Sequence, residues 1–521
     1  MNQYSNFTLI IMNRISILFL TVVFTLPLVF CDGSGSKNKE AAPSTEIPLM
    51  ERFENLEFIG KVAPRSSYKI KASRFGIQFN MNEIQDVDFL LKKAEESGVK
   101  WARVRTSYYN VSSEKGYYEW EELDKIINGL VEHKIKIFIC INNRDINLQA
   151  SERNEKSVVT NKAVQEYADA VSTLVRRYKD KVKYWEIFNE PEITPVYANT
   201  VDEASKVINQ IDPDAQVLAG SLARGQFSQL EYLINTVGSS IDVITFHPYN
   251  EFPEAMKHHW EVPVAGNKGS YMAGSMLIGE LRDQLGKKGQ SIELWQGECG
   301  YPSSEHTRSW KGRGPWGENI QAKWLLRRFL VDFSLDIPVT VYYLLREWKG
   351  PKAKQNAKGL LHYETEKSKQ GFRALQHLTG IFDDRLNAVK KVQSRFEFLD
   401  EGGFAGIAGE NDPGYLREYP PYKGAKSPYP IEVVALTGNE GDAVTYWLPW
   451  RMQEYVKPGK VNLFVEDINI QDPVLVDLLT GHIYRPKIEN REKGMLFKEV
   501  LLTDYPMAIV PLHLVKMKSE D

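Results

Sequence analysis

Two glutamates of this sequence stand where a pair of carboxyl groups could act on one bond. Glu190 lies in the run Trp-Glu-Ile-Phe-Asn-Glu-Pro, which ends at Pro191, and Glu298 lies in Leu-Trp-Gln-Gly-Glu-Cys-Gly, which ends at Gly300. Each glutamate follows or closes a short apolar stretch with the composition of a β-strand. Hydrolysis of a glycosidic bond requires two carboxyl groups that flank it. The pair therefore predicts cleavage of a glycosidic bond, if the fold brings the two residues together.

The segments around these glutamates alternate between strand-like and helix-like patterns. From about Phe75, short apolar or β-branched runs alternate with amphipathic segments at intervals of roughly 30 residues, which is typical of βα units on a parallel sheet. The eight predicted strands are Phe75–Phe79, Trp101–Arg105, Lys136–Ile141, Tyr184–Phe188, Gln216–Gly220, Ile241–Phe246, Glu293–Gly297 and Val339–Leu344. The predicted helices include Ile84–Ser97, Trp120–His133, Asn161–Tyr178 and Ile320–Phe333. Eight such units predict an α/β fold, a (β/α)8 TIM barrel, whose active site lies at the C-terminal ends of the strands.

Glu190 follows the fourth predicted strand and Glu298 closes the seventh, so both lie at the end of the barrel where its chemistry occurs. Three other glutamates are rivals. Glu186 lies within the fourth strand and suits the barrel interior or an ion pair, whereas Glu192 suits a loop. Glu293 begins the seventh strand and is therefore expected at the opposite end of the barrel.

A different pattern begins after about Asn387. Alternating runs separated by Gly-, Pro- and Asp-rich turns predict a C-terminal β-sandwich, and the clearest are Ile431–Leu436, Ala443–Leu448, Val461–Phe464 and Ala508–Val510. The whole chain then divides into a signal peptide over residues 1–31, a linker over 32–55, strands over 56–74 that could join the sandwich, the barrel over 75–386 and the sandwich over 387–521.

The N-terminal segment reads as a targeting signal. Arg14 precedes the apolar run Ile15–Phe30, which is a positively charged region followed by a hydrophobic one. The run ends in Leu-Val-Phe-Cys at Cys31, which resembles a bacterial lipobox, where the cysteine is lipidated and becomes the first mature residue. We expect a protein of the bacterial cell envelope, in the outer membrane and facing the periplasm or the surface, that touches the membrane only through its lipid anchor. The alternatives are a plain secretory signal or an uncleaved anchor.

Composition excludes several classes of partner. Lys and Arg number 65 against 68 Asp and Glu, a net charge of -3, so nothing favours binding to nucleic acid. The three cysteines form neither a disulfide framework nor a metal site, and the nine histidines are scattered. Cys140 is expected as a buried free thiol, although pairing with Cys299 stays open. We therefore expect neither a metal nor a cofactor. The glutamate pair predicts a carbohydrate substrate, and the oligomeric state stays open.

The motifs resemble clan A glycoside hydrolases, and most of all those around glycoside hydrolase family 39. The likeness runs from Phe75 to Ile381. Besides the two glutamate motifs it includes Gly98-Val-Lys-Trp-Ala-Arg-Val-Arg, Gly116-Tyr-Tyr-Glu-Trp, Gln321-Ala-Lys-Trp, Val341-Tyr-Tyr and Gly359-Leu-Leu. The C-terminal segment Val474–Val510, with Asp477-Leu-Leu-Thr-Gly, resembles the small β domain often fused to such barrels.

The resemblance implies a retaining glycoside hydrolase that cleaves β-linkages of an oligo- or polysaccharide by double displacement. Glu190 would be the acid/base, which protonates the leaving oxygen and later activates water, and Glu298 the nucleophile that attacks the anomeric carbon. Asn189 would bond the sugar 2-hydroxyl. Arg103, or Arg105 on the same side of the strand, would hold the nucleophile ionised.

Further positions match in the same way. His247 and Tyr249 would orient the nucleophile and the substrate. Trp348, or Trp310 and Trp316 in the preceding long loop, would form a platform for a sugar ring. Each of these aromatic residues could instead be a core residue, as could His247.

Three other functions remain alternatives. A non-catalytic carbohydrate-binding lipoprotein would have no need of both glutamates. A transglycosylase would share the covalent intermediate and differ only in the acceptor. A metal-dependent hydrolase on the same barrel would need His and Asp ligands at several strand ends, which the scattered histidines do not offer.

Overall fold

The computed structural model describes residues 53, 56–80, 86–107, 120–142, 157–223, 227–249, 252–254, 257, 262–264, 267–271, 283, 291–303, 317–348, 357–404 and 431–518. The chain divides into two units, Met1–Glu51 and Arg52–Asp521, and all described residues belong to the second. The predicted signal peptide with Cys31, and the candidate platforms Trp310 and Trp316, lie outside the described residues. Within them, no helix is long and apolar enough to cross a membrane.

Eight parallel strands close into a barrel, and all eight coincide with predicted strands to within a few residues. The strands are β2 (Phe75–Asn80), β3 (Trp101–Ser107), β4 (Lys136–Asn142), β5 (Tyr184–Ile187), β6 (Gln216–Leu222), β7 (Val243–Phe246), β10 (Glu293–Cys299) and β11 (Thr340–Tyr342). Their order around the barrel follows the chain, and β11 pairs with β2 to close it. The predicted (β/α)8 fold is therefore confirmed.

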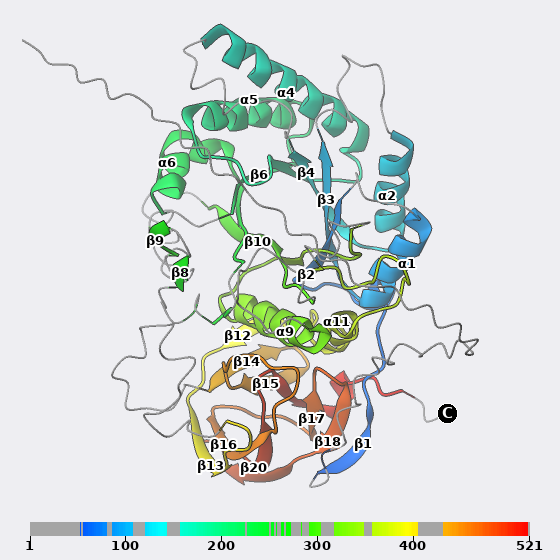
Figure 1. Cartoon of the computed structure of the whole chain (residues 1–521), viewed down its shortest axis with the longest axis vertical. Helices are drawn as coiled ribbons and strands as arrows, with labels where there is room; N and C mark the ends of the chain where they lie inside the picture. Colours follow the sequence, from blue (N-terminus) through cyan, green and yellow to red (C-terminus); the bar gives the residue numbers. More distant parts are fainter. Residues whose placement is uncertain are drawn as a thin grey trace, which may run out of the picture. The chain divides into compact units, whose positions relative to one another are not determined.

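Helices flank these strands, as Figure 1 shows. They are α1 (Val87–Ser97), α2 (Trp120–Glu132), α4 (Ser157–Tyr178), α5 (Pro195–Ile211), α6 (Phe227–Val237), α9 (Glu318–Ser334) and α11 (Gln370–Ile381). Local chemistry sets several ends. Thr194 caps α5 by accepting a hydrogen bond from Tyr197 N, with Pro195 in the first turn. Gly98 ends α1 at φ 74, a conformation that glycine adopts without strain.

The barrel interior changes from apolar to polar along the strands. Near the strand starts, an apolar cluster made of Trp101, Phe138, Leu218, Val243, Trp295, Val339 and Val341 fills the barrel. Side chains two residues apart on a strand share a face, so Arg103 lies above Trp101, and Arg105 lies above Arg103. Arg103 and Glu186 are fully buried in the layer above the cluster. The apolar floor thus supports a polar layer beneath the C-terminal strand ends.

The C-terminal part forms two antiparallel sheets. The larger has the order β1-β18-β17-β21-β15-β14-β12 and the smaller β13-β16-β20-β19. Their strands are β1 (Glu57–Lys61), β12 (Ala388–Lys390), β13 (Ser394–Asp400), β14 (Glu432–Gly438), β15 (Gly441–Trp447), β16 (Gly459–Glu466), β17 (Pro473–Asp477), β18 (His482–Arg485), β19 (Lys487–Arg491), β20 (Gly494–Leu502) and β21 (Met507–Pro511). The N-terminal strand β1 pairs antiparallel with β18. A hairpin of β8 (Val262–Val264) and β9 (Asn267–Tyr271), which the sequence patterns did not indicate, follows β7.

Helix α9 joins the barrel to this β domain through buried charges. Lys323 Nζ lies 2.8 Å from Asp504 Oδ1, and Arg327 Nε lies 2.6 Å from Glu254 Oε1. Trp447 of β15 donates its indole N–H to the same glutamate oxygen at 2.7 Å. Because buried charges are stable only when paired, these contacts tie the two parts of the unit together.

Candidate active site

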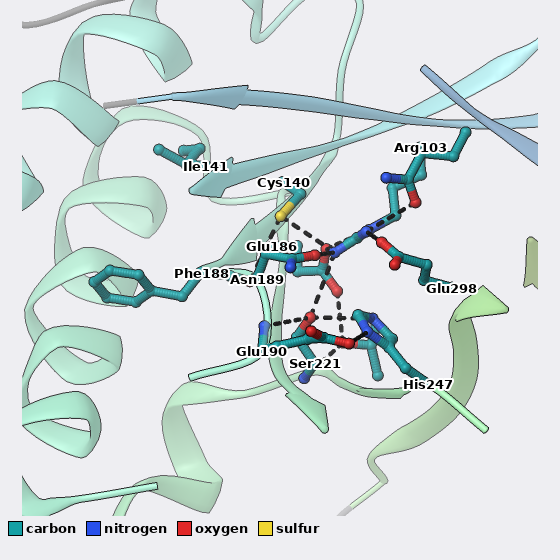
Figure 2. A network of polar contacts seen from close by, with 12 residues as sticks. Arg103, Cys140, Ile141, Glu186, Phe188, Asn189, Glu190, Ser221, His247 and Glu298 are labelled. Carbon is teal, nitrogen blue, oxygen red and sulfur yellow. Dashed lines mark hydrogen bonds and ion pairs between the residues drawn. The ribbon is translucent and has the colours of Figure 1, made fainter. Parts of the chain in front are cut away.

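Glu190 is placed by a sharp turn just after β5. Phe188 and Glu190 have φ values of 64° and 52°, in the left-handed region that non-glycine residues seldom occupy. The Phe188 ring anchors the turn on the outer side, where it stacks on Tyr167 with centroids 4.6 Å apart, and Figure 2 shows it directed away from the polar residues. The turn thereby directs Glu190 to the barrel mouth, at the expense of backbone strain of the kind found at functional sites.

Glu298 is held at the end of β10 as a buried carboxylate with both oxygens occupied. Oε1 accepts a hydrogen bond from Tyr249 Oη at 2.6 Å, and Oε2 accepts one from Arg103 Nη1 at 2.6 Å. Burial alone would raise the pKa of Glu298, but the electrostatic influence of His247, Arg103 and Arg105 and the Tyr249 hydrogen bond outweigh it and lower the pKa to about 2. Glu298 is therefore ionised at neutral pH, as a carboxylate nucleophile must be.

Arg103 is the centre of the polar layer (Figure 2). Its Nε donates to Glu186 Oε2 at 2.7 Å, and Nη2 donates to Asn189 Oδ1 at 2.9 Å, in addition to the Nη1 bond to Glu298. Thr245 donates to the other oxygen of Glu186. The neighbouring carboxylates raise the pKa of Arg103 despite its burial, so the guanidinium stays charged. The buried Arg103 guanidinium thus orients the side chains of Glu186, Glu298 and Asn189.

A serine and a histidine connect to Glu190. His247 Nδ1 lies 3.0 Å from Glu190 Oε1, and its Nε2 lies 3.1 Å from Ser221 Oγ. Ser221 Oγ also accepts the Glu190 backbone N–H at 3.3 Å. If Glu190 is ionised, His247 donates from Nδ1 and accepts from the serine; if Glu190 is protonated, these roles can reverse. The histidine can thus accompany either protonation state of Glu190.

The sequence patterns did not single out Ser221. It lies at an irregularity of β6, where the register with β7 shifts between Ala219 and Leu222 and Gly220 and Ser221 both have positive φ. Such bulges redirect a side chain and increase local twist. The signal available in the sequence was the Gly-Ser pair at the end of the fifth predicted strand, which is weak by itself.

Glu190, His247 and Glu298 form a compact set. One ligand-type atom from each lies within 4.8 Å of the other two, the arrangement in which three such residues could also hold a cation. Both oxygens of Glu298, however, already accept hydrogen bonds from Tyr249 and Arg103. A guanidinium bound to a carboxylate oxygen disfavours a second cation on that oxygen, so the donor set suits acid/base and nucleophilic chemistry better than metal binding.

The structure separates the candidates from their rivals. Glu186 is fully buried and ion-paired, Glu192 is exposed, and Glu293 begins β10 and accepts the Trp295 indole N–H, in agreement with the sequence interpretation. Arg103 reaches Glu298 directly, whereas Arg105 acts on it only through its charge. Cys140 and Cys299 are both buried free thiols, so the open pairing is not formed.

Trp348 follows β11 and packs against Tyr343. Its ring packs edge-on against Tyr343, with centroids 6.3 Å apart, and its indole nitrogen is buried without a hydrogen-bond partner among the described residues. The Tyr343 hydroxyl accepts a hydrogen bond from Asn80 at 3.5 Å. Among the described contacts, none joins Trp348 to Glu190 or Glu298, and its role as a sugar platform stays a prediction.

Comparison with known sequences relates part of the chain to a xylanase. No family model matches the chain. Endo-1,4-beta-xylanase A of Xylanibacter ruminicola is 20% identical over 162 residues, which is 27% of this chain and 44% of that protein. The chain thus spans less than half the length of this relative.

Solved structures of glycoside hydrolases share the architecture over most of the chain. A family 39 glycoside hydrolase from Bacteroides cellulosilyticus has a TM-score of 0.60 at 15% identity, and covers 85% of this chain and 81% of its own. A family 30 endoxylanase from Clostridium papyrosolvens has a TM-score of 0.53 at 12% identity, over 87% of this chain and 98% of its own. At these identities the likeness establishes a shared fold, with a barrel and an additional β domain.

Proposed function

We propose that this protein is a retaining glycoside hydrolase that cleaves β-glycosidic bonds, with Glu190 as acid/base and Glu298 as nucleophile. The observation that carries the proposal is the separation of the two carboxyl groups, whose nearest oxygens lie within 4.8 Å. Retaining enzymes hold the two groups about 5–5.5 Å apart, whereas inverting enzymes leave about 6.5–9.5 Å for a water. The short separation favours direct attack by a carboxylate.

In the first step the ionised Glu298 attacks the anomeric carbon, while Glu190 gives its proton to the leaving oxygen. In the second step Glu190 removes a proton from water, which displaces Glu298 and releases the sugar with its original configuration. The two residues are matched to these tasks by their surroundings. Glu298 is buried among cationic groups, whereas the Glu190 side chain is 36% exposed and open to water.

Asn189 is oriented for the sugar 2-hydroxyl. Because Arg103 Nη2 binds the amide oxygen at 2.9 Å, the amide NH2 is the end left to donate. A hydrogen bond to the 2-hydroxyl that strengthens in the transition state contributes several kcal/mol in such enzymes. Arg103 thus couples the nucleophile and the 2-hydroxyl contact through one rigid group.

The names of two similar proteins indicate which substrates should be tested first. The sequence relative and the family 30 structure are xylanases by name, so β-1,4-xylan and β-xylosides belong in the first panel. A transglycosylase would use the same intermediate with a sugar acceptor. A non-catalytic binder is disfavoured because a binding protein has no use for a strained, ion-paired carboxylate pair.

The test is hydrolysis of aryl β-glycosides and polysaccharides by the wild type and by Glu190→Ala and Glu298→Ala. We expect each substitution to lower kcat by about 1,000-fold or more, by loss of general acid/base or covalent catalysis. Added azide should restore activity to Glu298→Ala and give a glycosyl azide of inverted configuration. With a substrate that has a good leaving group, azide should also restore activity to Glu190→Ala and give a glycosyl azide of retained configuration. Glu192→Ala, an exposed glutamate two residues from Glu190, is the matched control. Wild-type activity in Glu298→Ala would refute the nucleophile assignment.

For location, we propose that Cys31 carries the lipid anchor of a bacterial envelope protein. Its support is the charged and apolar pattern before the cysteine. We also interpret the C-terminal sheets as the β-sandwich expected from the sequence. Incorporation of labelled fatty acid into the wild type but not into Cys31→Ser tests the anchor, and label in both variants would refute it.

A further inference from the structure

Lys358 places a positive charge beside the candidate nucleophile. Its Nζ lies 4.3 Å from the centroid of the Tyr249 ring and 5.8 Å from that of Tyr343. Tyr249 is the residue that donates its hydroxyl to Glu298 at 2.6 Å. An ammonium over the face of a tyrosine is attracted by the ring, which fixes the end of an otherwise flexible side chain. The ammonium is therefore held at the edge of the catalytic pair.

This ammonium lacks an acceptor among the described residues. No described oxygen accepts a hydrogen bond from Nζ, and no described carboxylate lies within ion-pair distance. Burial lowers the pKa of Lys358, and the attraction of Glu298, Glu190 and Cys299 opposes that effect without cancelling it. The charge is thus partly removed from water without a bonded counter-ion, although an ammonium has three N–H groups to donate.

The other buried lysines in the described part of the chain have hydrogen-bond acceptors. Lys323 binds Asp504 and the Gln453 carbonyl, and Lys369 binds Glu347 and Ser303. Lys100 donates to the Ser67 carbonyl at 2.9 Å. The ammonium group of each of these three lysines therefore has a hydrogen-bond acceptor. Lys358 differs from them in lying against the residues that would act on substrate.

Arg105 adds a second cation near the site. It shares a face of β3 with Arg103, nearer the barrel mouth, and its charge helps to lower the pKa of Glu298. Within the described part of the chain it has no ion pair. Lys358 and Arg105 thus both place positive charge near the catalytic pair, and within the described part of the chain neither forms an ion pair.

We propose that Lys358 binds an anionic group on the sugar, a carboxylate or a sulfate ester, so that the substrate is an acidic glycan. The inference rests on the proposed function and adds the class of substrate. A charge-assisted hydrogen bond to the ammonium would supply the missing acceptor and would select an acidic sugar over its neutral counterpart. Arg105 would add attraction for the same negative charge.

The test compares pairs of substrates that differ only at C6. Aryl β-D-glucuronide and β-D-galacturonide are measured against the β-D-glucoside and β-D-galactoside, with the 6-sulfated glycosides as the sulfate arm. We expect the wild type to prefer one acidic member, and Lys358→Met to lower kcat/KM for it by about 10- to 100-fold, more than for its neutral counterpart. Lys358→Arg should keep part of the preference. Lys367→Met, an exposed lysine of the same segment, should leave it unchanged.

The outcomes separate this inference from the proposed function. Cleavage of neutral substrates with no acidic preference would overturn the inference and leave the hydrolase intact. Equal losses on both members of a pair would also overturn it, because Lys358 would then serve the chemistry and not recognition. If no glycoside is cleaved, the proposed function fails on this panel, and calorimetric binding of glucuronate or glucose 6-sulfate decides. Binding that Lys358→Met abolishes supports the anion site, and no binding refutes it.

Discussion

Arg103 donates a 2.6 Å hydrogen bond from Nη1 to Oε2 of Glu298, and the arginine side chain has no exposed surface. The same guanidinium binds Glu186 on the opposite side. A single cation therefore compensates two buried carboxylates, only one of which is a candidate for chemistry. Glu186 fixes the arginine, and the arginine in turn fixes Glu298.

Arg103→Met should separate the structural and the chemical role of this cation. It leaves Glu186 and Glu298 buried without their partner, which costs about 3–5 kcal/mol. We expect a corresponding loss in urea unfolding and a fall of kcat/KM of at least about 100-fold as the nucleophile loses its charge partner. Arg103→Met combined with Glu186→Gln should recover part of the stability but none of the activity. Recovery of both would mean that Arg103 is structural alone.

Tyr249→Phe should change the acid side of the pH profile. Glu298 has a pKa of about 2 against an ordinary 4.5, so its ionised form stabilises the fold above about pH 4.5, and that contribution is lost as the pH falls towards 2. Removing the Tyr249 hydroxyl removes a hydrogen bond that favours the ionised form, and the pKa rises. We expect the acid limb of kcat/KM to move up by about one unit. An unchanged limb together with a lower plateau would show that Tyr249 orients substrate only.

The fold could be predicted from the sequence because each barrel strand carries its own local signal. Apolar runs such as Lys136–Ile141 are short, β-branched and bounded by polar segments, and the structure has a strand there. The candidate catalytic residues could be predicted from the sequence for a related reason. Glu190, His247 and Glu298 each follow or close a predicted strand, and parallel strands in a barrel bring those ends together.

The remainder of the site depends on geometry that no local pattern encodes. Ser221 reaches His247 through a bulge, and Lys358 reaches Tyr249 from an irregular segment after β11. The choice between Arg103 and Arg105 also required coordinates, since alternation puts both on one face and only depth in the barrel separates them. Such residues are positioned by tertiary contacts, so their spacing in the chain gives little sign of their neighbours.

Gly297→Ala tests how tightly the site is packed below the candidate nucleophile. A Cβ at this position would lie 3.1 Å from Thr245 Cβ, 3.3 Å from His247 Nε2 and 3.4 Å from Glu186 Oε1. These neighbours are held by hydrogen bonds and must shift for the methyl group to fit. We expect a loss of about 1–3 kcal/mol in stability and a clear fall in kcat, because the histidine beside Glu190 moves.

Gly380→Ala is the matched control in α11. A Cβ there meets only Ala63 O at 3.7 Å and Val62 at 3.8 Å, which are ordinary contacts. Alanine favours a helix over glycine by about 1 kcal/mol, so this variant should be as stable as the wild type or slightly more so, with the same kcat. Equal behaviour of the two variants in urea unfolding and in kcat would contradict the packing argument.

Lys323→Met tests whether the β domain is energetically part of the barrel. Lys323 of α9 is 1% exposed and binds both oxygens of Asp504, at 2.8 and 3.0 Å. Its loss leaves Asp504 buried without its charge partner, at a cost of about 3–5 kcal/mol. Because the pair bridges the two parts, we expect a lower midpoint for a single unfolding transition, followed in parallel by aromatic fluorescence and far-ultraviolet circular dichroism. Lys487→Met, which breaks an exposed pair with Glu499, should cost less than about 1 kcal/mol. Two separate transitions in Lys323→Met would instead show that barrel and β domain fold independently once this contact is removed.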